Sequence, residues 1–261
     1  MSNRLFAVAI VVTVSLWPGP AAAQTPARVD PSVPIVPDEG ARSDRVHSET
    51  NDLSWHLSKD VRAANGAISF QQGARGVWYF MESASLEHNP QIYSFLPDYA
   101  APCIGNLADK AIDGLACWRD PAHTVDHAPI VAVNFTGLAQ YPLYFAVPPH
   151  AVYMHPAPDR FAIVAWKSPL DATVQVTGAF TDLDPTCGNG ITVSIDRDQK
   201  QLAFGDLANG GATTFHLRSV RVARGNVLYF IVDPKSGDYV CDATMLDLTI
   251  AAYTHVEDSR Y

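Results

Sequence analysis

The sequence is short of the features that mark several large functional classes. Beyond residue 24 it has no apolar run of membrane length, and it has no long stretch of helical periodicity. It contains no G-x-S-x-G motif, no C-x-x-C pair and no H-E-x-x-H motif. The usual signatures of an α/β serine hydrolase, a cysteine-rich zinc site and a zinc metalloprotease are therefore missing.

The chain also lacks a cluster of basic residues. Its 27 acidic residues outnumber its 18 lysines and arginines, which gives a formal net charge of −9. We do not expect such a chain to bind nucleic acid or an anionic membrane surface. His123 and His127 have the H-x3-H spacing of a metal site, with Asp126 between them. No third ligand is close in the sequence, so we expect a solvated loop there.

What the sequence does contain is a succession of short segments between Val164 and Ile250 in which apolar and polar residues alternate. Turn sequences such as Asp-Pro, Gly-Asn-Gly, Asn-Gly-Gly and Lys-Ser-Gly-Asp separate them. This spacing predicts an all-β sandwich or barrel rather than an α/β fold. The predicted strands in this stretch are Thr173–Phe180, Ile191–Ile195, Gln201–Phe204, Thr214–Leu217, Val220–Val222, Val227–Val232 and Met245–Ile250. The first strands of the chain are predicted at Leu53–Leu57, Ile68–Phe70 and Val77–Met81.

The N-terminal residues are typical of a signal peptide. An apolar run from Leu5 to Trp17 precedes an A-x-A cleavage site at Ala21–Gln24. We therefore expect a secreted or periplasmic protein with no membrane span after cleavage. The predicted organisation is a signal peptide at 1–24, a flexible lead-in at 25–50, one domain at 51–256 and a tail at 257–261.

Four cysteines remain in this predicted mature chain, and an even number in an exported protein indicates disulfides. Three pairings are possible. Proximity in the sequence favours Cys103–Cys117, which would close a short insertion. It also favours Cys187–Cys241, which would tie the loop after the Phe180 strand to the loop before the last strand. In the chain-entropy model these two loops would contribute about 3 and about 4 kcal/mol.

A set of aromatic, aliphatic, glycine and acidic residues recurs at the strands and turns of this stretch: Trp166, Pro169, Val176, Gly178, Phe180, Leu183, Asp184, Gly225, Asn226, Leu228, Phe230, Val232, Asp242, Thr244, Leu246 and Ile250. Upstream of it lie Pro129–Gly137 and Pro148–Pro158, with His155-Pro156. Together these residues resemble the pattern of a jelly-roll domain family in secreted and envelope-attached bacterial proteins, and the resemblance covers most of the chain after about residue 50.

This resemblance implies a sandwich similar to carbohydrate-binding modules, in a family with no settled activity. Asn226 stands where the family more often has Asp, and the cysteines are not part of its pattern. We therefore expect an all-β, antiparallel β-sandwich of jelly-roll type. The segment Leu86–Asp126, which lacks clear periodicity, is expected to form an irregular insertion stapled by the first disulfide.

Acidic and amide side chains flank the second predicted disulfide. If Cys187 and Cys241 are bonded, these side chains lie on adjacent loops and could supply the hard oxygen ligands that Ca²⁺ requires. The resemblance adds that carbohydrate-binding jelly rolls often carry a structural calcium. The alternative is that Asp and Asn are here as ordinary turn residues. The candidate ligands are Asp182, Asp184, Asn189 and Asp242, with Asp238 nearby.

Aromatic residues gather in the first half of the chain. Exposed rings stack on the apolar C–H faces of sugars, and nearby polar groups bond the hydroxyls. Tyr93, Tyr99 and Trp118, in the predicted insertion, are the candidates for such a site, whereas Trp78 and Trp166 lie within strand patterns and are predicted to be core.

Three functions are compatible with these observations. The first is a non-catalytic sandwich that binds glycan or another cell-surface polymer, with a structural calcium as a candidate support. The second is a structural or assembly protein of the envelope or extracellular matrix. The third is a polysaccharide hydrolase or lyase, for which Glu82 and Glu87, beside the aromatic segment, are the first carboxylates to consider.

Overall fold

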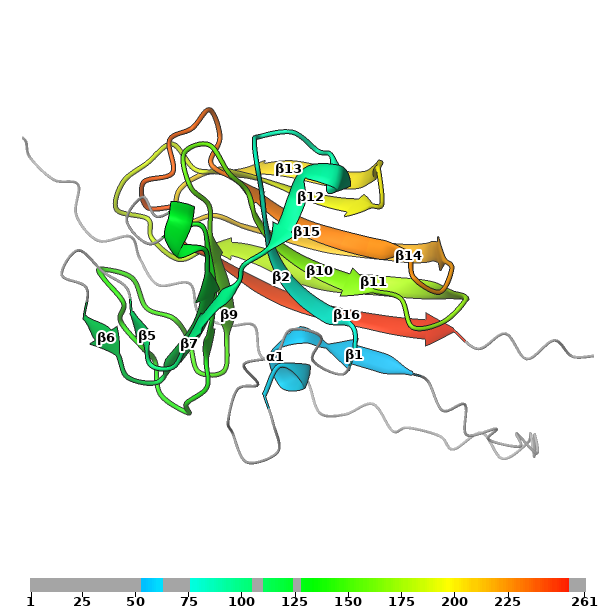
Figure 1. Ribbon diagram of the computed structural model, residues 1–261, viewed down its shortest axis with the longest axis horizontal. Coiled ribbons are helices and arrows are strands. Elements are labelled where there is room, and N and C mark those ends of the chain that lie inside the picture. The colour runs from blue at the N-terminus through cyan, green and yellow to red at the C-terminus, as the bar shows by residue number, and fades with distance from the viewer. Residues whose placement is uncertain (1–52, 63–75, 105–109, 124–127, 254–261) are drawn as a thin grey trace, which may run out of the picture. The chain divides into compact units, whose positions relative to one another are not determined.

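The computed structural model describes residues 53–62, 76–104, 110–123 and 128–253, within a compact unit that spans Glu49–Tyr261. Two antiparallel sheets face each other across one hydrophobic core (Figure 1). The predicted all-β sandwich is therefore confirmed. The predicted signal peptide (1–24), lead-in (25–50) and tail (257–261) lie outside the described residues, as do the predicted strand Ile68–Phe70 and the pair Asp126 and His127.

The larger sheet has eight strands, in the order β14, β11, β16, β9, β8, β7 and β4, with β1 pairing with β16 beyond β9. The strands are β1 (Ser54–His56), β4 (Asp98–Ala100), β7 (Leu115–Arg119), β8 (Ile130–Asn134), β9 (Val152–His155), β11 (Ala172–Asp182), β14 (Ala212–Val222) and β16 (Thr244–Tyr253).

The smaller sheet has six strands, in the order β13, β12, β15, β10, β2 and β3. They are β2 (Trp78–Ser83), β3 (Tyr93–Phe95), β10 (Ala162–Lys167), β12 (Ile191–Arg197), β13 (Lys200–Leu207) and β15 (Val227–Asp233). The remaining elements are a two-stranded sheet of β5 (Cys103–Ile104) and β6 (Ala111–Ile112), helix α1 (Leu57–Asp60), and the 3-10 turns η1 (Pro90–Ile92) and η2 (Pro121–His123).

In strands that have one face toward solvent, buried and outward-facing side chains alternate, and the buried ones build the core. Along β16, Leu246, Leu248 and Ile250 are buried between the sheets, and the residues between them face outward. The indole of Trp166 in β10 is fully buried and packs edge-on against Trp55 of β1, with ring centroids 5.2 Å apart. The period-2 pattern of the second half of the chain thus places one apolar face per strand in the core.

Some strands are buried on both faces. Such strands lack the alternation of apolar and polar residues from which strands are predicted. In β7, Trp118 faces the main core, whereas Leu115 and Cys117 face a second apolar cluster on the outer side of the large sheet. The segment predicted to be an irregular insertion therefore supplies β4 and β7 to that sheet. Cys103 and Cys117 form the predicted disulfide, with their Cα atoms 5.3 Å apart.

A bulge merges two predicted strands into one. Val174 of β11 lies opposite Val220 of β14, but Val176 lies opposite Leu217, so two residues of β14 face one residue of β11. The prediction of separate strands at Thr214–Leu217 and Val220–Val222 was wrong, because the bulge interrupts the alternation without ending the strand.

Three connections meet at one end of the sandwich: the β11–β12 loop, the β13–β14 turn and the β15–β16 loop. The Asp182 amide donates to the Gly211 carbonyl at 2.9 Å, and the Leu183 amide donates to the Ala243 carbonyl at 2.7 Å. Among the described residues, no helix has the length and apolar character needed to cross a membrane.

Candidate functional site

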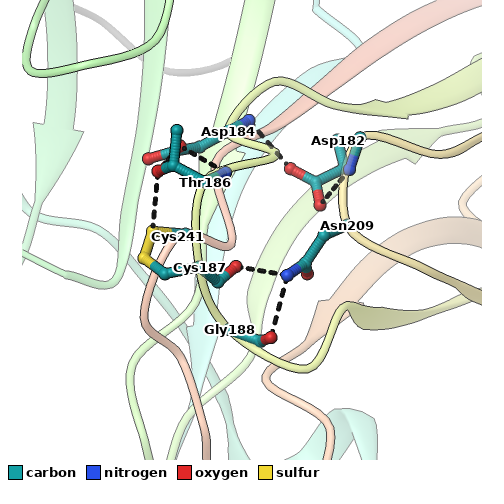
Figure 2. Close-up of a disulfide and its surroundings, with 8 residues drawn as sticks. Asp182, Asp184, Thr186, Cys187, Gly188, Asn209 and Cys241 are labelled. Atoms are coloured by element: carbon teal, nitrogen blue, oxygen red, sulfur yellow. Dashed lines mark hydrogen bonds between the residues drawn. A yellow bond between two sulfur atoms is a disulfide. The ribbon is translucent and has the colours of Figure 1, made fainter. Parts of the chain in front are cut away.

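The Cys187–Cys241 disulfide fastens the β11–β12 loop to the β15–β16 loop, as predicted (Figure 2). The two Cα atoms are 5.6 Å apart. The side-chain amide of Asn209, in the β13–β14 turn, donates to the carbonyls of Cys187 and Gly188 and so ties the third connection to the same junction.

Glycine is required where these loops touch. Gly188 has a φ of +83°, and a Cβ added to it would lie 2.2 Å from the carbonyl oxygen of Val240. Any larger residue would push the two loops apart, because that contact is with backbone.

The carboxylates of Asp182 and Asp184 accept hydrogen bonds that hold the β11–β12 loop in place (Figure 2). Asp182 accepts hydrogen bonds from the Asp184 amide at 2.9 Å and the Gly210 amide at 3.1 Å. Asp184 accepts from the amide and the hydroxyl of Thr186. These patterns are those of Asx turns, in which a carboxylate caps nearby backbone.

Asp242 differs from its neighbours. Its side chain is fully buried, and neither carboxylate oxygen has a hydrogen-bond partner among the described residues. Burial, together with the negative charges of Asp182, Asp238 and Asp233, raises the pKa of Asp242 to about 8. A buried, unpartnered carboxylate surrounded by other carboxylates is costly unless it holds a proton or a cation.

The four predicted calcium ligands are not equivalent in the structure. Asp182, Asp184 and Asp242 are buried at the junction, but the Asn189 side chain is exposed and its amide donates to the Lys235 carbonyl at 3.0 Å. Within the residues that the structure describes, no group of three or more His, Cys, Asp or Glu side chains is arranged to hold a metal ion. A full coordination shell would therefore need backbone carbonyls or water as well.

The three aromatic residues predicted to stack on sugars lie mostly in the interior. Trp118 is 2% exposed and packs on Phe80 with ring centroids 4.3 Å apart. Tyr93 is 9% exposed and packs edge-on against Tyr229, and Tyr99 is half-buried against Trp118. Stacking would require an exposed ring face, which neither Trp118 nor Tyr93 offers.

Glu82 and Glu87, the carboxylates first considered for hydrolysis, lie in different environments. Glu82 is fully buried in β2, with its Oε1 atom 3.7 Å from Nη1 of Arg160. Glu87 is exposed in the loop after β2.

Two cavities that the sequence did not reveal lie along the edge strands β13 and β14. Because their lining residues follow one another along both strands, we call the two cavities together the edge furrow. The cavity that we call its narrow end has a volume of about 100 Å³, and the cavity that we call its wide end has a volume of about 600 Å³. The narrow end is lined by Phe180, Val193, Ser194, Ile195, Ala203, Phe204, Gly205, Thr213, Thr214 and Phe215. The wide end is lined by Arg197, Lys200, Leu202, His216, Leu217, Arg218, Ser219, Val220 and Arg221.

The narrow end presents an aromatic ring to solvent. Phe204 of β13 is 75% exposed, whereas Phe215, across the furrow on β14, packs against Phe180 with ring centroids 5.5 Å apart. Thr213 and Thr214 of β14 line the same cavity. An exposed ring beside hydroxyls and unpaired strand edges offers both an apolar surface and hydrogen-bonding groups.

Comparisons with known proteins give partial structural likeness only. Neither a family model nor a curated protein sequence matches the chain. The CBM51 module from Clostridium perfringens GH95 in complex with methyl-galactose shares 13% identity over 39% of this chain and 69% of its own, with a TM-score of 0.31. The carbohydrate-binding module CBM36 in complex with calcium and xylotriose shares 12% identity over 38% and 76% of the two chains, with a TM-score of 0.24.

The environment of Asp242 predicts a pH-dependent stability. Its pKa is raised from 3.8 to about 8 in the folded protein, so between these values the folded state holds a proton that the unfolded state releases. In EDTA, the unfolding free energy should therefore fall as the pH rises from about 4 to about 8. Asp242→Asn should make this fall smaller and melt above the wild type at pH 8. Part of the fall should remain, because burial also raises the pKa values of Asp182 and Asp233.

Thermal unfolding of both proteins across this pH range, followed by circular dichroism, makes the test. Asp247→Asn, which alters an exposed carboxylate on β16, is the matched control and should keep the wild-type slope. Parallel curves for the wild type and Asp242→Asn would contradict this account of Asp242.

Proposed function

We propose that this chain is a non-catalytic, secreted β-sandwich that binds glycan in the edge furrow. The observation that carries the proposal is the exposed ring of Phe204 at a cavity that Thr213 and Thr214 also line. Sugar rings need such a combination, since their C–H faces stack on aromatic rings and their hydroxyls need polar partners.

The lining of the edge furrow supports a binding role over hydrolysis. Among the described residues that line either end of the furrow, there is no Asp or Glu. Glycoside hydrolysis ordinarily requires two carboxyl groups on either side of the scissile bond. The two disulfides support export, because disulfides persist in oxidising compartments.

We further propose that Ca²⁺ supports the loop junction, with Asp242 as the anchoring ligand. Its two unpartnered, buried carboxylate oxygens fit a hard divalent cation, and Asp182, Asp238 and Asp233 add negative charge around it. Asp184 accepts both hydrogen bonds from Thr186 through Oδ1, and Asn189 donates to the Lys235 carbonyl through its amide nitrogen, so Oδ2 of Asp184 and Oδ1 of Asn189 are the atoms that would join the cation. The ion would stabilise the junction electrostatically and would take no part in a reaction.

Calcium binding at Asp242 is tested by thermal unfolding with and without the ion. At pH 8 and a Ca²⁺ concentration a hundredfold above the dissociation constant, the wild-type midpoint should rise by about 5 to 10 °C. The rise should be smaller at pH 5, because Ca²⁺ must first displace the proton of Asp242. Asp242→Asn should show no rise, and an equal rise in both proteins would place the ion elsewhere.

Glycan binding is tested by affinity electrophoresis and calorimetry across a panel of polysaccharides. We expect Phe204→Ala to weaken binding about tenfold, which corresponds to about 1.4 kcal/mol for one lost stacking contact. Tyr144→Ala is the matched control, because Tyr144 is 80% exposed in the loop between β8 and β9 and lies outside the furrow lining.

Two results would overturn the placement of the site. One is binding that survives Phe204→Ala unchanged, and the other is binding lost in Tyr144→Ala. An absence of binding across the panel, together with concentration-dependent oligomers, would favour the assembly role instead.

A further inference from the structure

We propose that the edge furrow selects acidic polysaccharides, whose carboxylate or sulfate groups bind its wide end; this inference rests on the glycan-binding function proposed above. Four permanent cations, Arg197, Lys200, Arg218 and Arg221, line the wide end together with His216. The chain as a whole carries a net charge of −9. The wide end is therefore opposite in charge to the molecule that contains it.

The folded structure creates this cationic site from residues that are dispersed in the sequence. Arg197 ends β12, Lys200 begins β13, and Arg218 and Arg221 lie on β14 at the edge of the other sheet. The Arg197 guanidinium donates a hydrogen bond to the Arg221 carbonyl at 2.7 Å, and this bond links the two sheets. The sequence expectation of no basic cluster held for the linear order but not for the fold.

In the part of the chain that the structure describes, these cations have no carboxylate within ion-pair distance. The nearby carboxylates of Asp171 and Asp198 instead accept hydrogen bonds from the backbone amides of Arg224 and Val227. Cations left without partners repel one another, and an anionic ligand would remove that repulsion.

The charges on β13 and β14 also have a simpler explanation. Charged side chains on edge strands discourage pairing with other chains, and Lys200, Arg218 and Arg221 could serve only that purpose. Two observations favour a ligand. The charges are all of one sign around a cavity of about 600 Å³, which is within the size range of ligand pockets. The narrow-end cavity, farther along the same two edge strands, is lined by the exposed ring of Phe204, which edge protection does not require.

An acidic glycan fits these features better than other polyanions. Guanidinium groups bind carboxylate and sulfate oxygens in a bidentate manner, and the ring of Phe204 would stack on the sugar to which they are attached. A membrane or a nucleic acid duplex presents a broad anionic surface, which would also meet the acidic remainder of the molecule and be repelled by it. A single polysaccharide chain can enter the furrow without that contact.

The test compares ligands that differ only in charge. Binding of the full mature protein to polygalacturonate and to its methyl-esterified form is measured by calorimetry at 50 mM and 500 mM NaCl. We expect at least about tenfold tighter binding to the acidic form at low salt, and loss of most of that preference at high salt because salt screens the exposed charges.

Reversing the charge of two residues in the wide end tests whether the preference for the acidic polysaccharide arises there. The double variant Arg218→Glu/Arg221→Glu should lose the preference for polygalacturonate and keep its weaker binding to the esterified chain. Arg224→Glu, an exposed change outside the furrow lining, should keep the preference. Unfolding midpoints equal to that of the wild type would establish that both variants are folded.

Each contrary outcome has a distinct meaning. Equal binding of both polysaccharides, weakened by Phe204→Ala, would overturn the acidic selectivity and leave the glycan-binding function standing. No binding to either form would overturn both. A third outcome is equal binding of polygalacturonate, duplex DNA and phosphatidylserine vesicles, with binding of all three lost in the double variant. This result would overturn the selectivity for acidic glycans and indicate a general anion site.

Discussion

The structure depends on the pairing of β16, the last strand, along both of its edges. One edge pairs with β11 from Asp182 opposite Thr244 to Thr173 opposite Tyr253. The other edge pairs first with β9 and then with β1. Its inward residues fill the core, so a register slip of one residue would expose that whole apolar face. The residues just before β16 carry Cys241 and Asp242, and the strand pairing that builds the core therefore also sets the position of the loop junction.

The position of the edge furrow also follows from the order of the strands in the two sheets. Because β11 and β12 lie inside their sheets, β14 forms one edge of the large sheet and β13 forms one edge of the small sheet. The short β13–β14 turn keeps these edges close at one end, and the furrow is wider at the other, where the cations gather. Edge strands usually need protection from unwanted pairing. Here the same edges supply an aromatic ring and positive charge, the two features on which the proposed binding rests.

Much of the fold could be predicted from local patterns, because strands with one solvated face alternate visibly. Both disulfides could also be predicted, since each pair is close in the chain relative to the alternatives. Strands such as β7 were missed because apolar clusters cover both of their faces. The acidic junction was foreseen through its disulfide, but the turn roles of Asp182 and Asp184 depend on backbone geometry. The furrow could not be foreseen, because it requires knowing which strands lie at the edges.

The central claim is that the open edge between β13 and β14 is the surface that binds ligand. Hydrogen exchange measured by mass spectrometry, with and without a saturating acidic oligosaccharide, tests it most directly. We expect slower exchange within residues 197–222, which hold β13, β14 and the end of β12, and unchanged exchange in the loop between β8 and β9. Protection centred on that loop, with none along β13 and β14, would contradict it.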